Sequence, residues 1–471
     1  MTRSANFLFF ILPRMAAETH DDPDAPDRAA PTVRRRGPSR FGLELSPLVL
    51  LCAAMCALGV WLRVHALGFP SDFLFDEHHF VENARNYLAG KPDLNDHPPL
   101  GKLFIALSIA VLGDQSLAWR VPSLLFGLTA IAVAAVTARR LFGSQRAAWV
   151  AAAFVAADGF LIGYSRAALL DGYLALCSLL AVLIATTRPG LRSVVLGGLL
   201  AGAALSIKFS GVAVLVPLVI GIVTAKGVRV RRESSVLSLL GVAAVVYVAL
   251  YCVGLNLARQ PFSPADALAE TKRLYTHHAA LTEMKNALVS GWVSWALPTK
   301  PIMMGYVERL GTVRAMTSLG NLALWWPGIA LALVLCWRLL YRGLRATLRD
   351  EQREASVAGN AGPLASVAGL DFAGFLAAHG RSVLIVLGGA IGFVAPWAIS
   401  HRDSYIYHFL PSYVLLVTLL AGFVASEPRT TLVIAFLSLV LVVLAFYAPV
   451  WSMFETSTRA VNLRLFLPVW R

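Results

Sequence analysis

The chain alternates between apolar segments and short polar links. Several apolar segments are shorter than the ~20 residues that cross a ~30 Å hydrocarbon layer, but local bilayer thinning can accommodate them. The pattern predicts an all-α polytopic membrane protein with about eleven transmembrane helices. The predicted spans cover residues 43–67, 118–138, 147–163, 171–187, 192–207, 210–225, 235–254, 320–340, 382–399, 406–425 and 430–450.

The composition agrees with this pattern. The chain is 57% hydrophobic and 14% charged, with a mean hydropathy of +0.67, which is too apolar for a soluble domain. The net charge of +14 does not indicate nucleic-acid binding, because Arg and Lys cluster in short links, as in cytoplasmic loops. All five cysteines lie in apolar segments, which favours buried thiols over a disulfide or zinc framework.

The basic residues also predict an orientation. An arginine cluster at 34–36 precedes the first span and predicts a cytoplasmic N-terminus. Residues 192–225 have basic residues on both flanks, so an even number of crossings lies between them. Two short helices that meet near Lys208 satisfy this condition. Lys208 then lies at the outer face, rather than mid-membrane, where a charge costs about 2.5–3.5 kcal/mol.

The same reasoning divides the chain into regions. Residues 1–40 are rich in Asp, Ala, Pro and Arg and are expected to form a disordered cytoplasmic N-terminus. Residues 41–471 form one transmembrane domain. Its large outer loops are 68–117 and 255–319, and its long cytoplasmic link is 341–380.

The conspicuous ionisable clusters all fall on the outer side in this topology. A membrane protein rarely places so many ionisable groups beside its spans without using them. A carboxylate there can take a proton from an acceptor hydroxyl, and Arg or Lys can hold the phosphate of a lipid-linked donor. The richest region is the first outer loop, with Asp76-Glu77-His78-His79 and Asp96-His97-Pro98-Pro99-Leu100-Gly101-Lys102. The other members are Arg120, Arg166, Asp171, Lys208, His277, His278, His401, Arg402, Asp403 and His408.

This first outer loop resembles that of protein O-mannosyltransferases, which are integral membrane glycosyltransferases of the GT-C class. Five further elements resemble the family's motifs in the same order, over most of residues 43–425. A lone Asp-Glu pair would be weak support, whereas six elements in order are specific. The five are Ala118-Trp119-Arg120-Val121-Pro122, Ser165–Asp171, Leu205–Gly211, the tryptophans Trp292, Trp295, Trp325 and Trp326 around Gly320-Asn321, and Tyr407–Pro411.

The resemblance implies a GT-C fold with a helical first outer loop. It also implies transfer of mannose from a polyprenyl-phosphate carrier to Ser or Thr hydroxyls of exported polypeptides, with inversion, on the outer side of the cell membrane. The implied partners are the lipid-linked sugar donor, the polypeptide acceptor and membrane lipid, without nucleic acid. No cofactor is implied, and a divalent metal stays open because carboxylates and histidines lie close together.

The resemblance also suggests a role for each site residue. Asp76 is the expected catalytic base, and Glu77 would position the acceptor or tune Asp76, since neighbouring carboxylates raise each other's proton affinity. Arg120 would contact the donor phosphate or support the acidic loop. The other expected phosphate contacts are Lys102, Arg166 and Lys208, and the expected site-shaping residues are His97, Asp171 and His408. For Arg166 and Asp171, a structural ion pair is the alternative, and for Lys208 an interfacial anchor.

Two alternatives are weaker. The first is a lipid-carrier-dependent transferase that adds aminoarabinose or arabinose to lipid A or to a cell-envelope glycan. Those relatives tend to have Lys-Pro-Pro-Leu and then an aromatic residue, where this chain has a histidine at 97. The second is a transporter, but transporters place ionisable groups at the membrane midplane in repeated halves. The outer loop 255–319, of about 65 residues, is too short for the β-trefoil domain of eukaryotic members, so the chain resembles the bacterial type.

Overall fold

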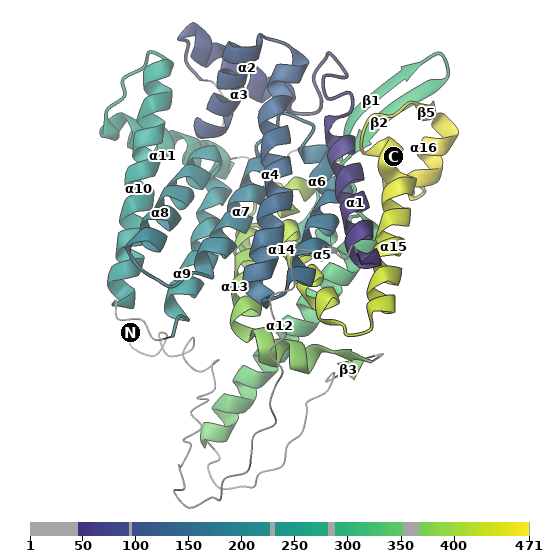
Figure 1. Ribbon diagram of the computed structural model, residues 1–471. Helices are drawn as coiled ribbons and strands as arrows, with labels where there is room; N and C mark the ends of the chain where they lie inside the picture. Colours follow the sequence, from purple (N-terminus) through teal and green to yellow (C-terminus); the bar gives the residue numbers. More distant parts are fainter. Residues whose placement is uncertain are drawn as a thin grey trace, which may run out of the picture.

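The structure, a computed structural model, describes residues 46–93, 97–226, 231–280, 288–351, 366–367 and 369–470. It is a bundle of roughly parallel and antiparallel helices with a small sheet at one corner (Figure 1). The tail predicted over 1–40 lies outside the described residues, as does Asp96.

Seven helices in the described ranges are long and apolar enough to cross a membrane. Shorter helices fill the bundle between them. The seven are α1 (Pro47–Val64), α4 (Ser116–Phe142), α10 (Arg232–Leu257), α12 (Leu322–Glu351), α13 (Phe372–Ile399), α14 (Leu410–Ser426) and α15 (Thr430–Tyr447). The shorter ones are α5 (Gln145–Ala156), α6 (Gly159–Tyr164), α7 (Asp171–Ala185), α8 (Leu191–Ile207), the 3-10 helix η1 (Phe209–Val214) and α9 (Leu215–Val223).

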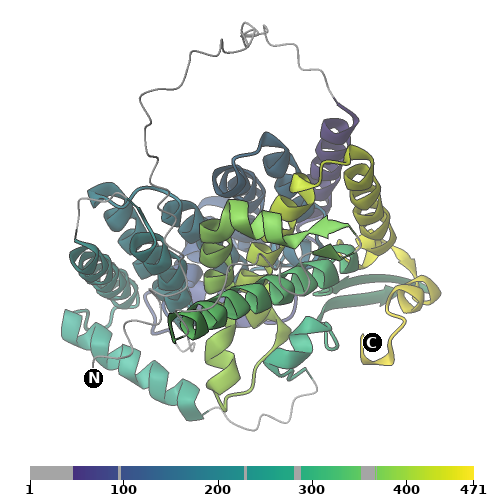
Figure 2. The same cartoon turned by 90° about the horizontal axis from the view of Figure 1, so that it is seen from below.

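Each predicted apolar segment coincides with helical structure, so the chain is a mostly helical, multi-pass membrane protein. The number of crossings stays a prediction, because only seven helices meet the length and composition criteria. The short α7 is almost wholly buried, and α14 is buried along nearly its whole length. These two helices therefore contact protein rather than lipid along most of their surface. Around them, α1 and α15 lie side by side at the edge of the bundle (Figures 1 and 2).

The first outer loop is helical, as predicted, and the second contains a helix and a hairpin. The first loop forms α2 (Glu77–Ala89) and α3 (Leu100–Leu112). The second forms α11 (Pro264–Ala280), η2 (Trp292–Ala296), β1 (Met303–Arg309) and β2 (Thr312–Thr317). The remaining elements are β3 (Ser366–Val367), β4 (Leu370–Asp371), η3 (Ile406–Phe409), η4 (Ala448–Val450), β5 (Thr456–Ser457), α16 (Thr458–Arg464) and η5 (Pro468–Trp470).

The prediction of an all-α protein missed the three-stranded sheet, whose order is β1-β2-β5 with antiparallel pairing. Leu310 and Gly311 form the hairpin turn with φ values of 48° and 78°, the left-handed values of a two-residue turn. Because β5 pairs with β2, the C-terminal segment lies on the same end of the bundle as the second outer loop. That placement agrees with the predicted topology.

The predicted link 341–380 contains parts of two long helices. Helix α12 continues to Glu351 and α13 already begins at Phe372, so helical structure enters the link from both sides. A hydropathy pattern does not detect the ends of α12 and α13 within the link, because these helix ends are polar and only the apolar parts of the two helices resemble spans.

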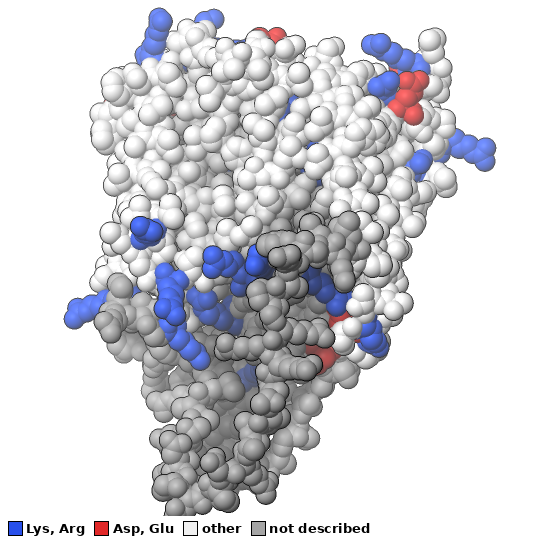
Figure 3. Space-filling view, viewed as in Figure 1, with Lys and Arg blue, Asp and Glu red and all other residues white. Residues whose placement is uncertain are grey.

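The two ends of the bundle differ in charge. Lys and Arg gather in a band across the lower half of the molecule in Figure 3. Exposed arginines lie at the end of α4 (Arg139, Arg140), near the start of α8 (Arg192) and before α15 (Arg429). We call this the basic end, and we call the opposite end, with α2, α3 and the hairpin, the loop end. The asymmetry is typical of multi-pass membrane proteins.

A buried carboxylate ties four helices together inside the bundle. Asp158 caps α6 and accepts hydrogen bonds from the backbone N–H of Asn321 (2.9 Å) and the hydroxyl of Tyr413 (2.6 Å). The Asn321 side chain in turn donates to the carbonyls of Ala157 (3.1 Å) and Val440 (3.0 Å). The network joins α6 to the starts of α12 and α14 and to the middle of α15. Sequence reasoning gave Asp158 no role.

We expect Asp158→Ala to destabilise the protein by several kcal/mol, because each buried donor that loses its acceptor costs ~1–3 kcal/mol. Tyr413→Phe removes one donor together with its own need for a partner, so its effect should be smaller. Thermal unfolding of the detergent-purified variants measures both changes. Equal midpoints for the parent and Asp158→Ala would contradict a role for this network.

Candidate functional site

Asp76 stands at a sharp bend in the first outer loop. The preceding residue, Phe75, has a φ of 44°, a left-handed value that is uncommon outside glycine and often marks functional sites. Asp76 occupies the N-cap position of α2, yet its side chain makes no capping hydrogen bond. The half-buried carboxylate therefore stays available to a ligand.

The neighbouring Glu77 is in the opposite situation, because it is fully buried. One carboxylate oxygen accepts the backbone N–H of Leu74 (2.8 Å) and the other that of Ala168 (2.7 Å). Arg120 donates to both oxygens at 2.9 Å. Four hydrogen bonds satisfy this carboxylate, so it binds the protein rather than a substrate.

Arg120 is equally saturated. Besides its two bonds to Glu77, it donates to the carbonyls of Leu67 (3.1 Å), Pro70 (2.8 Å) and Asp72 (2.9 Å). These bonds use all five guanidinium N–H groups. Of the two roles predicted for Arg120, the geometry favours support of the acidic loop over contact with a donor phosphate. We refer to this buried pair as the Glu77–Arg120 clamp.

Lys208 forms the second buried ion pair of the site. Its Nζ lies 2.9 and 3.1 Å from the two carboxylate oxygens of Asp171, at the start of α7. It also lies 4.8 Å from the ring centroid of Tyr407. Lys208 sits where α8 ends and η1 begins, which is the junction that charge placement predicted. The pair brings α7, α8 and η3 to one point.

Arg166 does not pair with Asp171, contrary to the alternative considered from the sequence. Its guanidinium donates to the carbonyls of Leu62 (2.6 Å) and His65 (2.7 Å) at the end of α1, and to Ser452 (3.2 Å) near the C-terminus. These contacts join α1, α6 and the segment after η4. They favour a supporting role over the predicted phosphate contact.

Lys102 and His97, for which the sequence predicted a phosphate contact and a shaping role respectively, are both held within the first loop. The buried Lys102 pairs with Asp93 and donates to the carbonyl of His97 (2.6 Å). The His97 ring stacks between Phe80 and His278, at centroid distances of 5.9 and 5.5 Å. Burial and the nearby positive charge of Lys208 hold the pKa of His97 well below its ordinary value, so the ring is neutral at pH 7. Sequence reasoning missed Asp93, because no motif marks it.

His408 is held rigidly on the other side of the site. Its Nδ1 accepts the backbone N–H of Tyr405 (3.1 Å), and its ring stacks on Trp397 at 3.7 Å. The adjacent Tyr407 faces Phe75 at 6.2 Å. Element η3 thus closes the site opposite the acidic loop, which is consistent with the predicted shaping role of His408.

Asp76 differs from the other two carboxylates of this cluster. Glu77 and Asp171 are each bound by a cation, whereas Asp76 has no side-chain hydrogen bond within the described residues. Burial raises the pKa of the Asp76 carboxyl, and the charges of His79 and Lys208 offset part of that rise. A partly desolvated carboxylate with an elevated pKa is suited to accept a proton. Within the described ranges, no group of three or more His, Cys, Asp or Glu residues could hold a metal ion.

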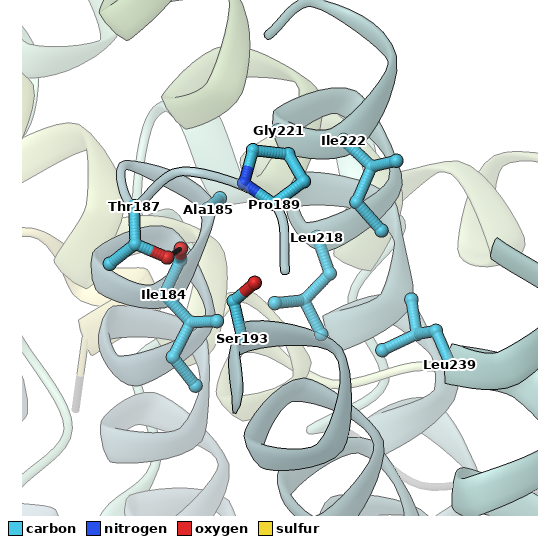
Figure 4. Close-up of a pocket in the computed structure, with 9 residues that line it drawn as sticks. All are labelled: Ile184, Ala185, Thr187, Pro189, Ser193, Leu218, Gly221, Ile222 and Leu239. Atoms are coloured by element: carbon cyan, nitrogen blue, oxygen red, sulfur yellow. Dashed lines mark hydrogen bonds between the residues drawn. The ribbon is translucent and has the colours of Figure 1, made fainter. Parts of the chain in front are cut away.

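Two hollows differ in chemistry. The one at the loop end lies beside His97 and is rich in polar groups. The other lies at the opposite end of α7 (Figure 4), and none of its lining residues has an ionisable side chain. The loop-end hollow is lined by Tyr87, Asp93, His97, Pro99, Tyr251, Gly254, Leu255, Ala258, Gln260 and Glu270. Of these two hollows, only the one at the loop end is therefore lined by ionisable groups.

The chain is similar to known proteins over most of its length. Two family models described as dolichyl-phosphate-mannose-protein mannosyltransferase match residues 53–117 and 96–252. The polyprenol-phosphate-mannose–protein mannosyltransferase of Mycobacterium tuberculosis is 24% identical, with 87% of this chain and 89% of the relative covered. The protein of the same name from Mycolicibacterium smegmatis is 25% identical, with 97% and 100% covered.

Solved structures share the fold. The Saccharomyces cerevisiae Pmt1–Pmt2 protein O-mannosyltransferase complex bound to the sugar donor superposes with a TM-score of 0.72 at 13% identity, over 90% of this chain and 92% of that one. ArnT from Cupriavidus metallidurans has a TM-score of 0.50 at 18% identity, over 81% and 60%. Taken with the family models and the mycobacterial relatives, these likenesses show that the chain is similar to protein O-mannosyltransferases over most of its length and shares their GT-C fold.

Proposed function

We propose that this protein transfers mannose from a polyprenyl-phosphate-mannose donor to Ser or Thr hydroxyls of exported polypeptides. The observation that best supports this reaction is that the adjacent carboxylates Asp76 and Glu77 have different environments. All acceptor positions of Glu77 are used within the clamp, whereas Asp76 is half-buried, lies within the electrostatic influence of Lys208 and has no side-chain hydrogen bond among the described residues. This arrangement fits a general base next to a site for an anion.

The reaction is a single displacement at the anomeric carbon. The acceptor hydroxyl oxygen forms a bond to C1 of the mannose, and the bond from C1 to the phosphate oxygen breaks. Asp76 takes the hydroxyl proton, and polyprenyl phosphate leaves with the electron pair of the broken bond. The configuration at C1 inverts, and no covalent enzyme intermediate forms.

Lys208 is the best candidate to stabilise the leaving phosphate. Its positive charge acts on the Asp76 carboxyl, whereas Arg120 donates all its N–H groups to the protein and both terminal nitrogens of Arg166 bind backbone carbonyls. Lys208 donates hydrogen bonds to Asp171. A phosphate oxygen bound beside Lys208 would share the three N–H donors of the ammonium with Asp171. Its pairing with Asp171 offsets the cost of burying the ammonium when no donor is bound.

The basic end of the bundle argues for the sidedness of the reaction. Arg-rich links favour the cytoplasmic side, and on this basis we expect the loop end and Asp76 to lie outside the cytoplasm. The acceptor would therefore be a polypeptide that has already crossed the cell membrane.

The first prediction concerns Asp76 itself. In membranes with matched protein levels, we expect the parent to transfer labelled mannose from polyprenyl-phosphate-mannose to a Ser/Thr-rich peptide. Asp76→Asn should lose about 10²-fold or more, because it removes the base, while its unfolding midpoint stays near that of the parent. Equal transfer by both proteins would remove Asp76 from the mechanism. A folded parent that modifies lipid A or a glycan, but no peptide, would overturn the proposed acceptor.

The second prediction separates the adjacent carboxylates. Glu77→Gln should lower thermal stability strongly, because removing one partner of a buried ion pair costs about 3–5 kcal/mol. Arg120→Lys should also destabilise, since Lys cannot reproduce the two-pronged contact. Unfolding midpoints of purified variants, with Asp76→Asn as the matched control, measure this. The idea fails if Glu77→Gln is as stable as Asp76→Asn.

The third prediction is a pH dependence. The base acts when deprotonated, so transfer should fall as the pH drops through the pKa of Asp76, which burial raises above its ordinary value of 3.8. The nearby positive charge of the exposed His79 lowers this pKa. His79→Gln should therefore move the acidic limb of the rate profile to higher pH. A limb that stays in place would contradict this coupling.

A further inference from the structure

Strand β1 lies at the edge of the three-stranded sheet. Strand β2 lies between β1 and β5, and no strand of the described residues pairs with the outer edge of β1. Exposed edges are normally paired, covered or blunted, because they present free backbone N–H and C=O groups. This edge is short, since a register shift between Met303 and Gly305 and the turn at Leu310 limit it on either side.

The register identifies the outward groups. Arg309 and Thr312 flank the two-residue turn and form the first pair of the ladder. In a two-residue hairpin this pair is hydrogen-bonded, and the pairs then alternate. Glu308 and Tyr306, opposite Val313 and Ala315, are consequently non-hydrogen-bonded positions. Their N–H and C=O groups point away from β2, towards the open edge.

The sheet contacts the first outer loop at two points. Gly305 lies so close to Leu74 that a Cβ at this position would be 2.4 Å from the Leu74 Cδ2. On β2, the Arg314 guanidinium lies 4.7 Å from the ring centroid of Phe69 and pairs with Glu455 at 2.9 Å. Leu74 is two residues before Asp76. The inner end of β1 thus adjoins the loop that holds the proposed base.

The dimensions suit a short peptide. A strand added beside β1 would lie ~4.8 Å from it and advance ~3.3 Å per residue. Glu308 to Gly305 therefore corresponds to about 10 Å of added strand, and Gly305 is the residue of β1 that packs against Leu74. An acceptor held by its main chain at Tyr306 and Glu308 would present a hydroxyl a few residues away, near Asp76.

We propose that the outer edge of β1 binds the extended main chain of the acceptor polypeptide as an added strand. This inference rests on the proposed function. A peptide added at a sheet edge is bound through its backbone groups, and its side chains affect binding only where they enter a pocket. A transferase with such an edge can accept many sequences around a Ser or Thr, provided that the segment is extended.

Glu308→Pro tests the proposal, with Glu308→Ala as the matched control. Proline removes an N–H that points outwards, so the β1–β2 ladder keeps its bonds, and edge strands tolerate proline. Both variants lose the Glu308 carboxylate, which accepts a bond from Tyr306. We expect Glu308→Pro to raise the KM for a Ser/Thr peptide about threefold to tenfold over Glu308→Ala, the effect of one hydrogen bond. The kcat and the KM for the donor should stay unchanged.

A second measurement avoids altering the enzyme. Acceptor peptides with single N-methylated backbone amides should show a KM rise at alternate positions on one side of the Ser or Thr, since only alternate amides face β1. Equal KM values for Glu308→Pro and Glu308→Ala, with no alternation among the peptides, would overturn the proposal. So would a change of oligomeric state in Glu308→Pro at unchanged KM, because the edge would then bind a second copy. Failure of the parent to modify any peptide would instead overturn the proposed function.

Discussion

The buried pair of Glu77 and Arg120 is the interaction on which the rest of the site depends. A charge inside a protein is costly unless it is paired and its remaining hydrogen-bonding groups are satisfied. Here both conditions are met by backbone groups from the first loop and from the segment after α6. The ion pair therefore fixes the path of the chain from the end of α1 to the start of α2. It also sets the position of the neighbouring Asp76.

The arrangement explains why two acidic residues stand side by side. The Glu77 carboxylate makes the loop rigid and, because its hydrogen bonds are used, cannot bind a substrate. The Asp76 carboxylate remains accessible to a substrate, and its position depends on Glu77. The Lys208–Asp171 pair is similar, because Asp171 fixes the position of the Lys208 ammonium and leaves it accessible to a ligand. Reactive groups in enzymes need such support from fixed neighbours to keep their geometry.

The sequence predicted which ionisable residues would lie at one end of the bundle better than which partners each of them would bind. The motif around Asp76 and the placement of Lys208 at a helix junction were both found, the first by resemblance and the second by charge placement. The roles of Arg120 and Arg166 depended on which carbonyls fold back onto them, and these partners are 48–53 and 101–286 residues away in the chain. No local pattern contains that information. The hairpin escaped prediction because strands of two to seven residues leave only a weak alternation.

The pairing of β5 with β2 has a consequence for biosynthesis. Thr456 and Ser457 complete the sheet, and the indole of Trp470 donates to the carbonyl of Pro298 (2.8 Å). Ribosomes make these residues after all eleven apolar segments, so the sheet beside the acidic loop closes only when translation of the last segment has ended. A nascent chain that has already inserted its helices would still lack this corner. This corner of the sheet would thus form after the last apolar segment has been made.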